Sequence, residues 1–142
     1  MILDSHSLHP SAFIHPSARI GANVSIGPYC VVGEHVTLGD GVQLVSHVAV
    51  EGRTQIGAGT RIFPFSSIGH IPQDLKYKGE PSTLVIGQNC TIRENVTINP
   101  GTAGGGMTTR IGDNCLIMAS VHVAHDCVLG NNVILASFVG LA

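Results

Sequence analysis

The stretch that decides the fold is residues 20–44, IGANVSIGPYCVVGEHVTLGDGVQL, in which an aliphatic residue returns at every sixth position. Neither an α-helix, with about 3.6 residues per turn, nor a strand of period two produces this spacing. A hexapeptide solenoid does, because each hexad supplies one short strand and one corner, and stacked coils bury a continuous column of side chains. The aliphatic positions are Leu8, Ile14, Ile20, Ile26, Val32, Leu38, Leu44, Val50, Ile56, Ile62, Ile68, Ile86, Ile92, Ile98, Ile111, Ile117, Val123, Leu129, Leu135 and Leu141.

A second inward position lies four residues after each aliphatic one and holds a small side chain. All four cysteines occupy this position: Cys30, Cys90, Cys115 and Cys127. Their spacing matches neither a zinc site nor a disulfide framework, and free cysteine packs well in a tight interior. We therefore predict buried thiols that stay reduced, as is usual in cytosolic proteins.

Length and composition indicate one domain, residues 1–142, with 44% hydrophobic and 11% charged residues. No apolar run approaches the roughly 18 residues that cross a bilayer, and the N-terminus lacks the pattern of a secretory signal. We therefore expect no membrane span and a cytoplasmic location. A net charge of −2 without a Lys/Arg cluster argues against a nucleic-acid partner.

The aliphatic spacing is interrupted twice. Residues 69–84 are polar and contain two prolines, which predicts an external loop over about 70–84. Residues 100–110, PGTAGGGMTTR, predict a glycine-rich bulge; because no phosphate-binding motif is present, we interpret it as a backbone detour. Three hexads per triangular turn predict about six coils, preceded by an irregular cap over residues 1–7. The predicted fold class is therefore an all-β parallel β-helix.

The residues best suited to chemistry are His122, His125 and Asp126, within VHVAHD. The outward histidines can share one surface with the acid. Three interpretations remain open: a general base with an orienting carboxylate, a metal site completed by a neighbouring subunit, and polar residues lining a subunit interface. An acid beside a histidine is a common orienting device, which places the base ahead of the metal.

Several motifs together resemble those of the acyl-ACP:UDP-N-acetylglucosamine O-acyltransferases, which catalyse the first step of lipid A biosynthesis. They are QDLKY at residues 73–77, GEP at 79–81, IRENVTI at 92–98, the glycine-rich bulge and HVAHDC at 122–127. The resemblance implies a left-handed β-helix in a homotrimer with active sites between subunits. It also implies acyl carrier protein, with its phosphopantetheine arm, and UDP-N-acetylglucosamine as substrates, with no metal or further cofactor.

The resemblance also implies roles for individual residues. His125 resembles the general base that deprotonates the sugar 3-hydroxyl, and Asp126 resembles its orienting partner. The residues that resemble substrate-binding groups are Gln73, Asp74, Lys76 and His122.

The sequence departs from the family in two ways. The family enzyme is nearly twice as long and has a C-terminal helical domain; in it a Gly-His pair, whose Gly N–H stabilises the oxyanion, follows the position of Ala142. We therefore expect the 142-residue chain to show at most trace activity. Asn99 stands where some relatives carry a basic residue. Two alternatives stay open: a metal-dependent trimer resembling γ-class carbonic anhydrases, and a non-catalytic trimeric scaffold.

Overall fold

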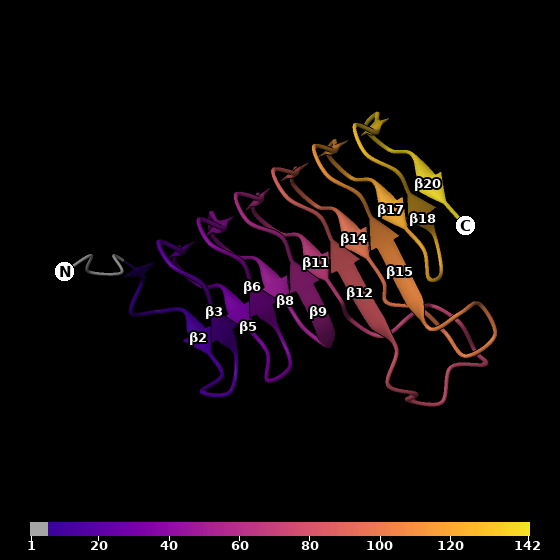
Figure 1. Ribbon diagram of the computed structural model, residues 1–142, viewed down its shortest axis with the longest axis horizontal. Coiled ribbons are helices and arrows are strands. Elements are labelled where there is room, and N and C mark those ends of the chain that lie inside the picture. The colour runs from indigo at the N-terminus through magenta and orange to yellow at the C-terminus, as the bar shows by residue number, and fades with distance from the viewer. Residues whose placement is uncertain (1–5) are drawn as a thin grey trace.

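The computed structural model describes residues 6–142 as a triangular prism of stacked coils, with β1 (Ser7–Leu8) and Ala142 at opposite ends of the prism (Figure 1). Each coil contributes one strand to each of three parallel sheets. Sheet I contains β1 (Ser7–Leu8), β4 (Ser25–Ile26), β7 (Gln43–Leu44), β10 (Arg61–Ile62), β13 (Thr91–Ile92), β16 (Leu116–Ile117) and β19 (Ile134–Leu135).

Sheet II contains β2 (Phe13–Ile14), β5 (Val31–Val32), β8 (Ala49–Val50), β11 (Ser67–Ile68), β14 (Thr97–Ile98), β17 (His122–Val123) and β20 (Gly140–Leu141). Sheet III contains β3 (Arg19–Ile20), β6 (Thr37–Leu38), β9 (Arg53–Ile56), β12 (Thr83–Ile86), β15 (Thr108–Ile111) and β18 (Val128–Leu129). The described chain therefore makes six complete coils and two strands of a seventh, as the spacing predicted. It contains no helix that could span a membrane.

The strand register explains why the aliphatic column is continuous. Ile62 pairs with Leu44 on one side and Ile92 on the other, so each aliphatic residue stacks directly on its equivalents. Residues at the aliphatic and small positions of the central coils are fully buried, including Ile26, Cys30 and Val123. At roughly 25 cal/mol per Å² of apolar surface removed from water, this column is the main stabilising feature of the fold.

All four cysteines are free thiols. Cys30, Cys90 and Cys115 are buried as predicted, whereas Cys127 is half-buried because it lies near the last coil of the chain. Burial raises the pKa of the Cys30 and Cys90 thiols and outweighs the hydrogen bonds they receive, so both stay protonated near neutral pH.

Three predictions about the core and the insertions need correction. Leu8 is 43% exposed and is not a core residue, because β1 is an edge strand with no further coil stacked on it within residues 6–142. The external loop ends at residue 82 and the bulge at residue 107, because β12 begins at Thr83 and β15 at Thr108. These longer strands place Leu84 and Thr109 inside the prism, where both are fully buried. Residues 1–5 of the expected cap lie outside the described part.

The corners depend on residues that tolerate a left-handed backbone. Twelve described non-glycine residues have φ between 50° and 70°, and half of them are Asn or Asp. Short polar side chains adopt this conformation more readily than branched ones do. Asp126 is one of these residues, with φ of 64°. The same corner conformation therefore places its carboxylate beside the two insertions.

Candidate active site

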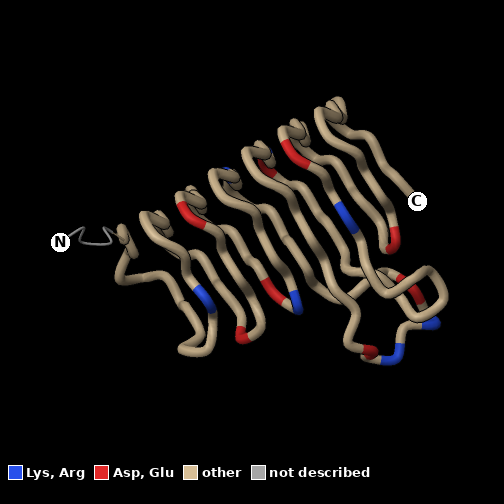
Figure 2. The backbone as a smooth tube through the Cα atoms, in the orientation of Figure 1, with Lys and Arg blue, Asp and Glu red and all other residues tan. Residues whose placement is uncertain are grey.

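The candidate site lies on the corner between sheets II and III, where the external loop, the glycine-rich bulge and the turn from β17 to β18 come together (Figure 1). The loop and the bulge are tied to each other, because the N–H of Ala103 donates to Glu80 Oε1 at 3.0 Å. The loop carries charges of both signs, as Figure 2 shows, whereas most of the coils carry few charged residues. Both interruptions of the repeat therefore lie at the same corner of the prism.

His125 and Asp126 form a hydrogen-bonded pair. His125 Nδ1 lies 2.8 Å from Asp126 Oδ2, and both side chains are mostly shielded from water. An ionised carboxylate only accepts hydrogen bonds, so the ring proton belongs on Nδ1. In the neutral ring Nε2 then carries the lone pair. Nε2 is 4.0 Å from Asp74 Oδ2 of the external loop, which places the basic nitrogen on the cavity side.

Thr102 of the bulge holds the Asp126 carboxylate from the other side. Its N–H donates to Oδ1 at 2.7 Å, and its hydroxyl donates to Oδ2 at 2.5 Å. Burial raises the pKa of Asp126, but the two bonds from Thr102 and the one from His125 outweigh it, so the pKa lies below its ordinary value. Asp126 is therefore ionised at neutral pH and available to orient His125 and to stabilise its protonated form.

The backbone of the site is equally constrained. The N–H of Asp126 donates to the buried Thr109 hydroxyl at 2.8 Å, which anchors the turn to the preceding coil. Gly105 passes so close to the carboxylate that a Cβ there would lie 2.0 Å from Asp126 Oδ2. A side chain at this position is excluded unless the bulge or the carboxylate moves. The glycine-rich sequence of the bulge is thus explained by its close approach to Asp126.

Two adjacent cavities meet at His125. The first, of about 230 Å³, is lined by Asp74, Lys76, Glu80, His125, Asp126 and bulge residues 102–105. The second, of about 260 Å³, is lined by Gln73, Asn99, His122, Ala124, His125, Leu141 and Ala142. All six residues singled out from the sequence therefore line the two cavities that meet at His125. His122 is fixed there by a 2.7 Å hydrogen bond between its Nδ1 and Thr97 Oγ1.

Sequence analysis did not identify the residues that support the pair. Thr102 and Thr109 were not named, and Glu80 appeared only within the motif GEP at residues 79–81. Their positions depend on the exact course of the bulge, which the period of six does not specify. The three consecutive glycines of the bulge were the available signal that the backbone approaches another group closely.

Within residues 6–142, no group of three or more His, Cys, Asp or Glu side chains is arranged to hold a metal ion.

Residues 17–52 and 108–142 match the bacterial transferase hexapeptide family (six repeats). The chain belongs to this family. It is 53% identical, over all 142 residues and 53% of the relative, to an acyl-[acyl-carrier-protein]–UDP-N-acetylglucosamine O-acyltransferase of Sinorhizobium fredii. It is 56% identical to the enzyme of that name from Rhizobium johnstonii over 99 residues, which are 70% of this chain and 36% of the relative.

The fold of this hexapeptide-family chain matches solved structures closely. The crystal structure of a UDP-N-acetylglucosamine acyltransferase from Bacteroides fragilis superposes with a TM-score of 0.92 at 47% identity, over 95% of this chain and 52% of that one. The fold is therefore the left-handed parallel β-helix that the resemblance implied. The chain spans about half the length of these relatives.

Proposed function

We propose that this chain carries the catalytic pair of an acyl-ACP:UDP-N-acetylglucosamine O-acyltransferase, which transfers a 3-hydroxyacyl chain to the sugar 3-hydroxyl in the first step of lipid A biosynthesis. The observation that carries this proposal is the His125–Asp126 pair, with Nδ1 held at 2.8 Å and Nε2 directed to a cavity. The names of relatives more than 50% identical supply the substrates.

In this reaction His125 Nε2 takes the proton of the sugar 3-hydroxyl while the oxygen attacks the thioester carbonyl. A carbon–oxygen bond forms to give a tetrahedral intermediate, whose collapse breaks the carbon–sulfur bond. The imidazolium then returns its proton to the departing phosphopantetheine thiolate. Asp126 remains ionised throughout and stabilises the imidazolium, because its carboxylate faces Nδ1–H.

The surrounding residues bind substrate in this proposal. Lys76 supplies a positive charge to the first cavity, suited to a phosphate of the nucleotide sugar or of the phosphopantetheine arm. Gln73 and His122 offer hydrogen bonds in the second cavity. Asp74, whose carboxylate lies 4.0 Å from His125 Nε2, is placed to accept a hydrogen bond from a sugar hydroxyl.

The proposal includes a homotrimer in the cytoplasm, with the His122 and His125 face at the subunit interface and acyl carrier protein as the acyl donor. A partner subunit would close the two cavities, which are open to solvent in the single chain.

Replacing His125 with Ala tests the proposed base. In a full-length version of the protein, we expect the rate of 3-hydroxyacyl transfer from acyl carrier protein to UDP-N-acetylglucosamine to fall about 100-fold or more, because a sugar hydroxyl is a poor nucleophile without a proton acceptor. His9→Ala, at an exposed corner of the first coil, is the matched control and should leave the rate unchanged. Unchanged transfer in His125→Ala, with the fold intact by circular dichroism, would overturn the assignment and favour a scaffold.

A further inference from the structure

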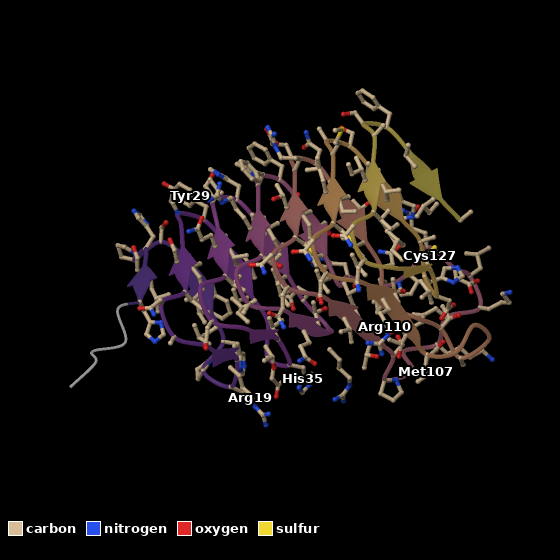
Figure 3. The ribbon with its side chains drawn as sticks, turned by 45° about the horizontal axis from the view of Figure 1, so that its top comes forward. Arg19, Tyr29, His35, Met107, Arg110 and Cys127 are labelled. Carbon is tan, nitrogen blue, oxygen red and sulfur yellow. The ribbon has the colours of Figure 1, made fainter. Side chains whose placement is uncertain are left out.

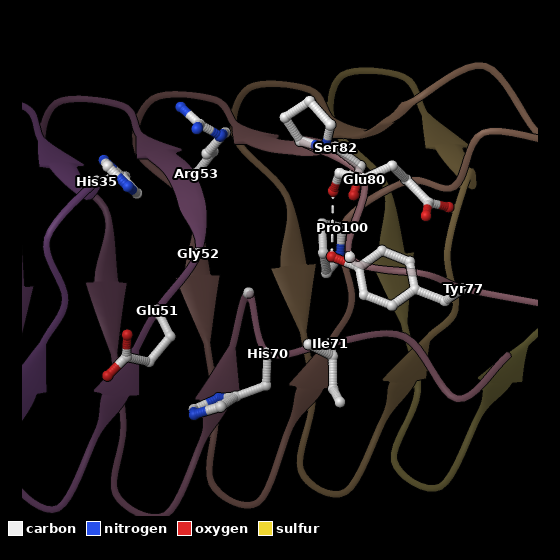
Figure 4. Close-up of a pocket in the computed structure, with 13 residues that line it drawn as sticks. His35, Glu51, Gly52, Arg53, His70, Ile71, Tyr77, Glu80, Ser82 and Pro100 are labelled. Atoms are coloured by element: carbon white, nitrogen blue, oxygen red, sulfur yellow. Dashed lines mark hydrogen bonds between the residues drawn. The ribbon is translucent and has the colours of Figure 1, made fainter. Parts of the chain in front are cut away.

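A cavity on the N-terminal side of the external loop lies apart from the two cavities at His125. It measures about 550 Å³, within the range of small-molecule sites. Figure 4 shows its walls: the corner around Gly52 on one side, and Tyr77 with the end of the external loop on the other. Glu80 is the one residue that it shares with the cavity at Asp126.

One end of this cavity is cationic. Arg53 and His35 lie side by side there (Figure 4). Among the described residues, none forms a hydrogen bond or ion pair with the Arg53 guanidinium. The cavity continues along the outer face of sheet III into a second hollow of about 460 Å³, which His35 and Arg53 share with Arg19. Arg19 and His35 project from the same side of the prism (Figure 3), and the Arg19 guanidinium is likewise without a partner.

The opposite end is apolar. The Tyr77 ring, Ile71, Pro81 and Pro100 form its wall, and the Tyr77 hydroxyl is bonded to Glu80 O at 3.2 Å, which fixes the ring against the cavity. Ser82 adds a polar group to this wall: it is 5% exposed, and its hydroxyl has no hydrogen-bond partner. The Ser82 oxygen itself has almost no exposed surface, so the wall that meets a ligand is apolar.

Two acidic residues, Glu51 and Glu80, also line the cavity, and neither forms an ion pair with Arg53. Glu80 accepts hydrogen bonds from the N–H groups of Lys78 and Ala103, and its carboxylate points away from Arg53 (Figure 4). Glu51 rests against the preceding coil, since a Cβ on Gly33 would lie 2.2 Å from its Oε2. Glu34 of the second hollow lies 3.8 Å from His35 Nε2, so the positive charge that a ligand meets at this end is that of the Arg53 guanidinium.

We propose that this cavity is a second binding site, for a small organic anion whose charged group meets Arg53 and whose flat apolar body packs on Tyr77. A phosphate and a carboxylate both pair with a guanidinium in a two-pronged arrangement, so either group satisfies the cationic end. The site is independent of the acyl transfer proposed above, because none of His125, Asp126 and Lys76 lines it.

Binding of phenyl phosphate and of benzoate to the intact chain, measured by calorimetry, tests this site and separates the two kinds of anion. The chain has two tyrosines and no tryptophan, so in a Tyr29→Phe background the fluorescence of Tyr77 alone reports where the ligand sits. We expect at least one of the two anions to bind and to change Tyr77 fluorescence, and inorganic phosphate or benzyl alcohol alone to bind at least about 10-fold more weakly.

Two variants decide between this site and unspecific attraction. Arg53→Gln should weaken binding about 10-fold or more, whereas Arg61→Gln, an exposed arginine on sheet I, should leave it unchanged. Absence of binding by both anions at millimolar concentration, or binding unaffected by Arg53→Gln, would overturn the proposal.

Discussion

Replacing Thr102 with Val removes one hydrogen bond from the Asp126 carboxylate and keeps the shape of the side chain. Thr102 is 4% exposed, and its hydroxyl lies 2.5 Å from Asp126 Oδ2, so no water can easily replace it. A hydrogen bond to a charged group contributes about 1.5–3 kcal/mol to stability. We expect the free energy of unfolding at about pH 7 to fall by roughly that amount.

The loss should depend on pH in a defined direction. The pKa of Asp126 is lowered in the folded protein, so the stability that its ionised form contributes is present above the pKa of the unfolded chain and is lost as pH falls through the folded pKa. Thr102→Val reduces that lowering. The difference between variant and parent should therefore be largest at neutral pH and shrink as Asp126 becomes protonated in acid.

Urea denaturation at neutral and acidic pH measures this difference. Thr60→Val is the matched control: Thr60 is also buried in the prism, but its hydroxyl donates to the uncharged Gly87 carbonyl at 2.9 Å. Its destabilisation should be the same at both pH values. If Thr102→Val lowered the free energy of unfolding by the same amount at neutral and at acidic pH, the reasoning would be refuted. The hydroxyl would then contribute through packing and not through the carboxylate charge.

Three further predictions concern the bulge, the core and the assembly. Gly105→Ala should disturb the site, because the new methyl group would lie 2.0 Å from Asp126 Oδ2, whereas a methyl group at Gly104 would have no atom within 4 Å and should be neutral. The acyltransferase rates of the two variants, made in a full-length version of the protein, test this. Val123→Asp should unfold the surrounding coil, because Val123 is fully buried and an unpaired carboxylate there costs several kcal/mol, which circular dichroism on heating would detect; an unchanged melting curve would contradict the register. Sedimentation should show a trimer at micromolar concentration, and a monomer would argue against a site shared between subunits.

Much of the fold could be predicted from the sequence because the repeat acts locally and equally on every coil. An aliphatic residue every six positions determines which side chains point inward, and parallel stacking then pairs each with its equivalent, as Ile62 does with Ile92. The same regularity made the two insertions visible as departures and pointed to His122, His125 and Asp126. The ends of the insertions were less well predicted, because strand pairing extends β12 and β15 beyond the period.

Only the tertiary structure decided how the candidate site is supported. Thr102 is 24 residues before Asp126 in the chain, and Asp74 lies on a loop from an earlier coil, yet both come to the same imidazole–carboxylate pair. The cavity between Arg53 and Tyr77 likewise joins segments whose sequences carry no common motif. A repeat specifies the rise and the corners of a coil, whereas the path of an insertion is set by hydrogen bonds between residues far apart in the chain, and those bonds exist only once the coils have stacked.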